Sequence, residues 1–266
     1  MATYVFSDVH GHFKTLERLL ERVSPADEDV VWTLGDMVDR GPDPISVMRV
    51  CRELCKDHVL MGNHEDMMLD AFHHPNDAMT VFQWEINGGA TTRVGLDSLS
   101  TEDRIDLVSW AEELSLGSHV EVGDRKYLLV HAGLRHLGFT SHSRWTDATM
   151  NALIRYQNRE DVLWIRDEFW GQPTGFINEK GEGPVVIAGH TPVPYVEDLA
   201  DVYDRSSRDD DGYCRVMHLG ATDKTGGVAD RWAIDCGAAG GAHWGSLAMI
   251  RLDDGMEFYE PVLEDE

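Results

Sequence analysis

The segment that most constrains this chain lies at residues 35–41, where a short apolar run ends in the sequence GDMVDRG. The run Val30–Leu34 is typical of a buried strand, and it delivers Asp36 and Asp39, followed directly by Arg40. A carboxylate at the end of a buried strand is costly unless it meets a cation, and an arginine fork matches a phosphate. The flanking glycines suit a sharp turn or a close approach of the backbone to a ligand. Alone, the segment indicates either a metal and phosphate site or a surface turn with a salt bridge.

Two further strand-like runs flank this segment and complete a βαβαβ pattern. Thr3–Ser7 precedes an amphipathic helical pattern, and His58–Met61 follows a second one. Each of the three apolar runs ends in a polar cluster. Because open α/β sheets bind ligands outside the carboxyl ends of their strands, we expect the three clusters to meet at one edge.

The remaining sequence predicts more helices and then more strands. Residues 65–116 have a mainly helical pattern, broken at Gly88 and Gly89. Strands are predicted at residues 120–122, 127–130, 185–188, 232–235, 247–252 and 256–259. Residues 193–230 predict a long polar loop or hairpin, which could be a specificity flap or an inert surface loop. Its aspartates at 209–211 lack the EF-hand spacing, so a calcium loop is disfavoured.

No internal repeat or linker is visible, and we expect a single domain over residues 1–266 with a frayed tail at 263–266. The 23 basic and 48 acidic residues give a formal charge of −25, which disfavours binding to nucleic acid or anionic membranes. The excess acid is either a solubility feature or a sign of a salty habitat. The four cysteines have no paired spacing, and Cys51 and Cys55, one helical turn apart, are expected to be small apolar residues. Without a leader or an apolar span we expect a cytoplasmic protein, and we also expect a monomer.

Five separate strand ends carry side chains that can bind a metal or a phosphate. They are Asp8 and His10; Asp36, Asp39 and Arg40; Asn63 and His64; His131; and His190. A single histidine after a strand is more often a structural residue, but five such clusters near glycines favour a shared site. Carboxylate, imidazole and amide donors without thiolate suit Mn²⁺, Fe²⁺ or Zn²⁺. Six candidate ligands exceed the needs of one open site and fit two metals that share a carboxylate.

Such a pair of ions can hold phosphoryl oxygens and lower the pKa of a water molecule between them. Arg40 would then neutralise the remaining phosphoryl charge. His64 stands next to a ligand but is not needed as one, so it is a candidate to protonate a leaving alkoxide. Asp39 could hold the imidazole of His64 in its acidic form. The residue types therefore predict hydrolysis of a phosphate ester.

Five segments resemble, in order and spacing, the signature of the calcineurin-like metallophosphoesterases. They are residues 8–11 (DVHG), 35–41 (GDMVDRG), 62–65 (GNHE), 131–133 (HAG) and 189–191 (GHT). The pattern is most similar to the phosphoprotein phosphatase branch in its compact bacterial and phage form, and residues 234–237 resemble the closing segment of that family. The resemblance implies a four-layer α/β fold, with two central mixed β-sheets packed as a sandwich and flanked by helices. It also implies a dinuclear metal site at one edge.

The resemblance implies a role for each motif residue. It gives six metal ligands: Asp8, His10, Asp36, Asn63, His131 and His190. It places Asp8, His10 and His190 on one metal. It places Asn63 and His131 on the second metal, and Asp36 bridges the two. His64 matches a general acid and Asp39 its partner, and Arg40 and Arg166 match phosphate-binding arginines. For Arg166 the alternative is a salt bridge with Asp167 or Glu168, and residues 87–89 (NGG) are expected to form a structural turn.

The implied activity is that of a metal-dependent phosphomonoester hydrolase with two divalent ions, Mn²⁺ foremost. The expected substrate is phosphoserine or phosphothreonine in a protein or peptide. Symmetrical diadenosine tetraphosphate hydrolases share the fold and metal centre, and they remain the alternative. Asp39, together with Glu65 after His64, favours the phosphatase. A non-catalytic scaffold is disfavoured because no ligand or catalytic position is missing.

Overall fold

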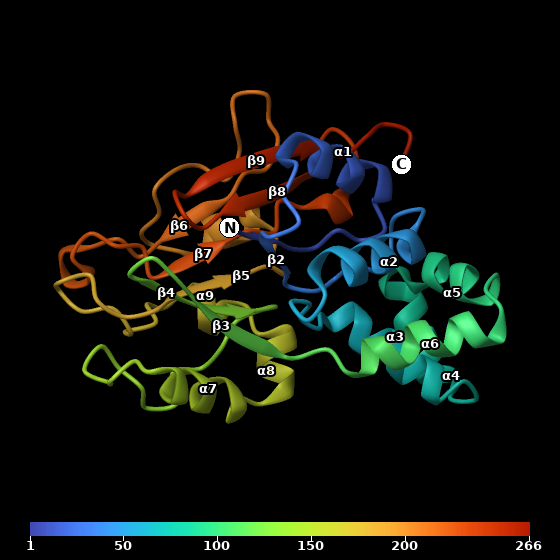
Figure 1. The fold of residues 1–266 in the computed structure, drawn as a ribbon, viewed down its shortest axis with the longest axis horizontal. Coiled ribbons are helices and arrows are strands. Elements are labelled where there is room, and N and C mark those ends of the chain that lie inside the picture. Colours follow the sequence, from blue (N-terminus) through green and yellow to red (C-terminus); the bar gives the residue numbers. More distant parts are fainter.

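The computed structural model describes residues 1–266 and contains two β-sheets flanked by helices (Figure 1). The first sheet has the order β2-β1-β8-β9, with β1 at Thr3–Phe6, β2 at Val30–Thr33, β8 at Ser246–Arg251 and β9 at Met256–Pro261. The second has the order β3-β4-β5-β7-β6, with β3 at Gly117–Val122, β4 at Arg125–Val130, β5 at Val185–Ala188, β7 at Arg231–Ala233 and β6 at Met217–Leu219. Both sheets are mixed, since β1 is parallel to β2 and antiparallel to β8, and β5 is parallel to β4 while β6 is antiparallel to β7.

The alternation of side chains along β1 buries both faces of the first sheet. Val5 belongs to the core between the two sheets, whereas Tyr4 and Phe6 belong to the core under the outer helices. Helices α1 (Phe13–Val23) and α2 (Pro44–Cys55) contribute to the outer core. Helices α7 (Asp147–Arg155), α8 (Arg159–Trp164) and α9 (Asp167–Trp170) pack against the second sheet. The predicted four-layer architecture is confirmed.

A group of helices between the third and fourth motifs forms a separate lobe of the molecule, on the right of Figure 1. This helical insert contains α3 (Asn63–His73), α4 (Ala78–Trp84), the π-helical turn η1 (Glu85–Gly89), α5 (Ala90–Asp97) and α6 (Thr101–Glu112). The predicted break is present, because Gly88 in η1 has a non-helical φ of 109°. The helical pattern predicted for this region is confirmed.

Two predicted segments differ in the structure. Residues 58–61 form only isolated bridges, from Val59 to Thr33 and from Leu60 to Ser115, although the first still runs parallel to β2. The stretch 193–230 is not simply a loop, because it contains α10 (Val193–Leu199), β6 and a short 3₁₀ helix, η2 (Asp223–Thr225). A second such turn, η3, follows β7 at Ala238–Gly240. Two valines of α10, at 193 and 196, and Met217 and Leu219 of β6 are buried in the core, and this burial outweighs the polar local sequence.

The prediction of a frayed tail is wrong. The carboxylate of Glu266 accepts the backbone N–H groups of Lys14 at 2.6 Å and Thr15 at 2.9 Å, in the first turn of α1. The N-cap residue of this helix, His12, provides no side-chain cap. A remote carboxylate therefore satisfies helix N–H groups that would otherwise lack a partner. In Figure 1 the C-terminal end lies close to α1.

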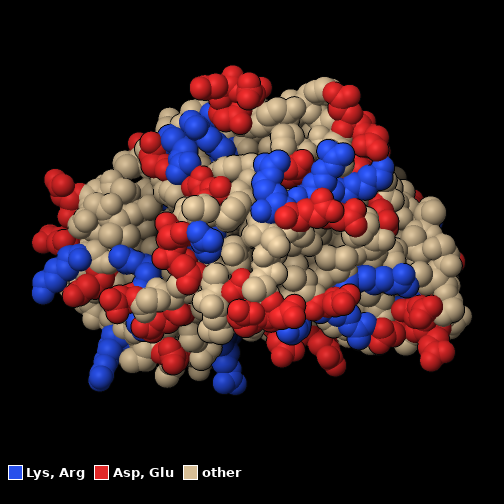
Figure 2. All heavy atoms as spheres, turned by 45° about the horizontal axis from the view of Figure 1, so that its top comes forward, with Lys and Arg blue, Asp and Glu red and all other residues tan.

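Most of the charged side chains lie on the surface, and the cysteines lie in the interior. Figure 2 shows acidic side chains spread over the visible face with basic ones among them, so the negative charge is not gathered in one patch there. All four cysteines are free and buried, as expected for small apolar residues. None of the helices combines the length and the apolar character that crossing a membrane requires.

Candidate active site

Most of the predicted site residues lie on loops that leave the carboxyl ends of β1, β2, β4 and β5 or at the start of α3, and Arg166 lies between α8 and α9. The first two loops are joined by backbone hydrogen bonds, from His10 N–H to Asp36 O and from Gly11 N–H to Met37 O, both at 2.9 Å. Gly41 N–H donates to His10 O at 2.8 Å, and a Cβ at Gly41 would lie 2.2 Å from that oxygen. The glycine therefore permits a backbone contact that holds the two loops, and their carboxylates, close together.

The backbone of the site is strained. Six predicted site residues have a left-handed backbone with φ between 48° and 70°: Asp8, His10, Asp36, Asp39, Arg40 and His190. Only four other non-glycine residues in the chain have a positive φ. Such a conformation costs about 1–3 kcal/mol per residue and persists only where the surrounding structure enforces it. Its concentration in these loops marks them as a functional site.

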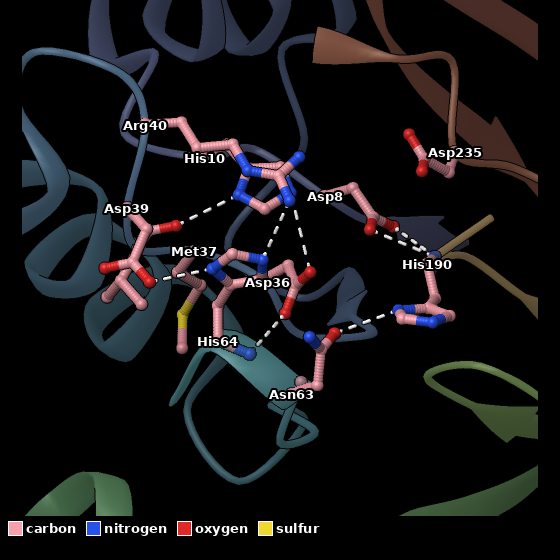
Figure 3. Close-up of polar contacts among 12 residues, drawn as sticks. Asp8, His10, Asp36, Met37, Asp39, Arg40, Asn63, His64, His190 and Asp235 are labelled. Carbon is pink, nitrogen blue, oxygen red and sulfur yellow. Dashed lines mark hydrogen bonds and ion pairs between the residues drawn. The ribbon is translucent and has the colours of Figure 1, made fainter. Parts of the chain in front are cut away.

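His10 and Asp36 form, with His64, the first group of possible metal ligands, and Asp8, which the family resemblance adds to this metal, lies beside them (Figure 3). His10 Nδ1–H donates to the carbonyl of Val38 at 3.1 Å, so Nε2 is free to act as a ligand and lies 3.4 Å from Asp36 Oδ2. Both oxygens of Asp8 accept the backbone N–H of His190, at 3.0 and 3.1 Å. A hydrogen bond that fixes one imidazole nitrogen and leaves the other free is typical of metal-binding histidines.

Asn63, His131 and His190 form the second group. His131 Nδ1–H donates to the carbonyl of Leu34 at 2.9 Å, and its Nε2 lies 2.9 Å from Asn63 Oδ1 and 3.5 Å from Asp36 Oδ1. His190 Nδ1 lies 2.9 Å from the same Asn63 oxygen. The expectation that the His190 ring shares a group with Asp8 and His10 is therefore wrong. Only its backbone reaches Asp8, because the ring is turned toward Asn63 at the start of α3.

The two groups fit a pair of divalent cations that share Asp36. Burial, together with the neighbouring Asp8, raises the pKa of Asp36 well above its usual range. Burial, together with Asp235, does the same to the pKa of Asp8. Burial also lowers the pKa of His131 to about 3, so this imidazole is neutral and able to bind a metal. Buried carboxylates and neutral imidazoles at hydrogen-bond distances form a donor set that suits cations.

The groups predicted to act on the phosphate surround these ligands. His64 Nδ1 lies 2.7 Å from Asp39 Oδ2, and its Nε2 lies 3.1 Å from Arg40 Nη2. Arg166 Nε donates to His190 Nε2 at 3.1 Å, so it lies on the other side of the ligand groups. Arg166 forms no ion pair, so neither Asp167 nor Glu168 explains its position. The geometry brings two guanidinium groups and one imidazole to a single cluster of possible metal ligands.

Two residues that organise the site, Glu65 and Asp235, were not predicted to be site residues. Glu65 accepts backbone N–H groups from Asp36 and Met37, both at 2.8 Å, and from Gly62 at 2.9 Å. Its carboxylate thereby fixes the shape of the 35–41 loop. Asp235 is buried near Asp8 (Figure 3), and burial raises its pKa to about 6. The sequence signal for both was their place inside motifs, at 62–65 and 234–237.

Comparison with known proteins defines the class. Residues 1–218 match the calcineurin-like phosphoesterase family, and the chain belongs to that family of hydrolases. Over 202 residues it is 27% identical to serine/threonine-protein phosphatase 2 of Salmonella typhimurium, a match that covers 74% of this chain and 83% of that relative.

Other relatives carry a different name. The chain is 30% identical over 141 residues to a symmetrical bis(5'-nucleosyl)-tetraphosphatase of Proteus mirabilis, covering 50% of this chain and 45% of that relative. This match spans less than half of the relative's length. A solved metallophosphoesterase from Sphaerobacter thermophilus shares the fold with a TM-score of 0.51 at 18% identity, covering 99% of this chain and 89% of the other.

Proposed function

We propose that this chain is a phosphomonoesterase that removes phosphate from phosphoserine and phosphothreonine in proteins. It would use two divalent cations, Mn²⁺ foremost, held by the two groups that share Asp36. The observation that supports this proposal most is the buried pair of His64 and Asp39, placed between those groups and Arg40. A general acid beside a phosphate-binding arginine serves an ester whose leaving group needs a proton.

The residues divide the reaction between them. The bond from phosphorus to the leaving oxygen breaks, and a bond from phosphorus to a water oxygen forms. When bound, the cations would polarise the phosphoryl group and activate that water. Protonated His64 Nε2 would give its proton to the leaving alkoxide, while Asp39 accepts Nδ1–H and stabilises the positive ring. Arg40 and Arg166 would hold the remaining phosphoryl oxygens.

A cavity along α3 supports a peptide substrate over a dinucleotide. It has a volume of about 530 Å³ and reaches from Trp84 and Trp164 toward the far end of the helix. The Trp164 ring lies 5.8 Å from the ring of His190, so the cavity begins next to the site. A continuous cavity beside the phosphate position is the natural place for the rest of the substrate.

The charge of this cavity distinguishes the two substrate classes. Three carboxylates line it, from Asp66, Asp70 and Glu112, and Arg159 is its one formally charged cation. Asp66 pairs with Arg159 at 2.6 Å, while Asp70 lies 2.9 Å from His74 and Glu112 lies 2.6 Å from His73, so the cavity carries a net negative charge where these histidines are neutral. A negative wall repels the additional phosphates of a dinucleotide and attracts a basic peptide. The longer match to the Salmonella phosphatase supports the same choice.

The tetraphosphatase remains the second candidate, because the Proteus relative is 30% identical over 141 residues of this chain. A substrate panel on the Mn²⁺-loaded chain separates the candidates. We expect hydrolysis of p-nitrophenyl phosphate and of phosphoserine peptides, with basic peptides preferred over acidic ones, and loss of both activities with EDTA. Rapid conversion of diadenosine tetraphosphate to two ADP, with negligible release of phosphate from peptides, would overturn the proposal.

A further inference from the structure

The Asp39 carboxylate is buried and receives hydrogen bonds from three side chains, of which His64 is only one. Trp84 Nε1–H donates to its two oxygens, at 3.1 and 3.0 Å. The Thr92 hydroxyl donates to Oδ1 at 2.6 Å, and its oxygen accepts the Asp39 backbone N–H at 2.8 Å. Asp39 and Thr92 are fully buried, and Trp84 is 5% exposed. Both oxygens of the carboxylate therefore have fixed partners, and the group cannot rotate without losing them.

The two additional donors come from the helical insert, Trp84 at the end of α4 and Thr92 in α5. The η1 turn between them lies directly against the 35–41 loop. A Cβ at Gly89 would lie 2.4 Å from Trp84 Nε1, and a Cβ at Gly88 would lie 2.6 Å from Arg40 Cγ. The carbonyl of Gly88 also accepts the Arg40 backbone N–H at 3.0 Å. The two glycines allow this close contact, so the turn holds the indole in place and fixes the arginine.

We propose that Trp84 and Thr92 are positioning residues for the general acid, an inference that rests on the proposed function. They act through Asp39, whose Oδ2 they keep aimed at His64 Nδ1. A fixed acceptor at Nδ1 determines the tautomer and direction of the ring, so that Nε2 faces the leaving oxygen. If the carboxylate turned, His64 would lose this orientation and protonate the leaving group less efficiently.

The kinetic test compares isosteric variants on two leaving groups. Trp84→Phe and Thr92→Val each remove a donor, Thr92→Ser keeps the hydroxyl, and Trp110→Phe is the control within the insert. We expect the first two to lower kcat for phenyl phosphate by about 10–100-fold, the usual effect of losing such a partner. The loss should be smaller for p-nitrophenyl phosphate, whose leaving group needs less protonation. KM should change little, and Thr92→Ser and Trp110→Phe should behave like the wild-type chain.

Equal losses of kcat on both substrates would overturn the inference, as would a Thr92→Ser variant as impaired as Thr92→Val. A second readout does not depend on activity. The His64 Nδ1 proton should give a downfield proton resonance, assigned by its loss in His64→Asn, that shifts or broadens in Trp84→Phe and Thr92→Val. An unchanged resonance in both variants would also overturn the inference. If the wild-type chain hydrolysed no phosphomonoester, the proposed function would fail, while this resonance would still test the positioning.

Discussion

The backbone N–H of His190 lies within 3.1 Å of both carboxylate oxygens of Asp8, although the two residues are 182 positions apart. This contact joins the loop after β1 in the first sheet to the loop after β5 in the second. It requires a glycine beside it, since a Cβ at Gly189 would lie 2.0 Å from Asp8 Oδ2. The contact between the sheets and the position of a predicted metal ligand therefore depend on the same glycine.

We expect Gly189→Ala to weaken binding of Mn²⁺ by at least about 10-fold, because the added methyl group displaces the Asp8 carboxylate. Mn²⁺ titration of the purified variant measures this. Gly123→Ala is the matched control, because this glycine has a positive φ but no atom near the added methyl group. The control should lose about 1–2 kcal/mol of stability and no metal affinity. A Gly189→Ala variant that binds Mn²⁺ like the wild-type chain would show that Asp8 is not a ligand.

Replacing His64 should separate proton transfer from metal binding. We expect His64→Asn to lower kcat by about 10²–10⁴-fold, the usual range for a general acid, with two metal ions per chain retained. The loss should be smallest for substrates with good leaving groups. His142→Asn, at an exposed position, is the control and should leave kcat unchanged. If His64→Asn hydrolysed phenyl phosphate at the wild-type rate, His64 would not be the acid.

Asp204, in the 193–230 stretch, should contribute stability that depends on pH. Burial alone would raise the pKa of Asp204, but hydrogen bonds from His218 and Arg205 hold this pKa below its usual range. A carboxyl with a lowered folded-state pKa stabilises the protein above its unfolded pKa of about 3.9, and this stability is lost as the pH falls further. We expect Asp204→Asn to cost about 1 kcal/mol at pH 7, a modest value because the side chain is 31% exposed.

Urea unfolding between pH 7 and pH 3 measures this contribution. The difference between Asp204→Asn and the wild-type chain should shrink as the pH falls below about 4. Asp201→Asn, an exposed neighbour, should show no difference at any pH. If the difference in the free energy of unfolding between Asp204→Asn and the wild-type chain stays constant over this range, the charge of Asp204 is not what stabilises the protein.

The thiols should be unreactive in the folded protein. Burial raises the pKa of Cys214 to about 11 and raises the pKa of Cys236 well above its usual value. Because the thiolate is the nucleophile, little of either reactive form exists at pH 8. We expect a chromogenic disulfide reagent to modify neither residue in the native state and all four cysteines in guanidinium. Rapid labelling of Cys214 or Cys236 in the native protein would contradict their burial.

Most of the fold and the set of site residues could be predicted because each polar cluster directly follows an apolar run. The ends of parallel strands meet at one edge of a sheet, so order along the chain was enough to bring together Asp8 after β1 and Asp36 after β2. His131 follows β4 in the second sheet, and order along the chain does not by itself predict that it joins them. The direction of a ring could not be predicted in this way. His190 has its backbone at Asp8 and its imidazole at Asn63, and spacing alone does not distinguish these two contacts.

Contacts made by residues outside the motifs could not be predicted from the sequence either. Trp84 and Thr92 contact Asp39 from 45 and 53 positions further along the chain, and nothing local predicts which face of α4 or α5 meets the 35–41 loop. The order of the tail could not be predicted either, because the cap that Glu266 supplies to α1 depends on where β9 ends in space. These contacts arise from tertiary packing, which local patterns do not encode.

Asp36 belongs to both ligand groups, and the metal content of ligand variants shows whether its carboxylate binds both cations. Equilibrated with Mn²⁺ and freed of excess, the wild-type chain should retain two ions per molecule. Asp8→Asn and His131→Asn should each retain one, because each removes a ligand from a single group. Asp36→Asn should retain neither, since its carboxylate serves both. An Asp36→Asn variant that keeps two ions, or a wild-type chain that binds only one, would show that Asp36 does not bridge two cations.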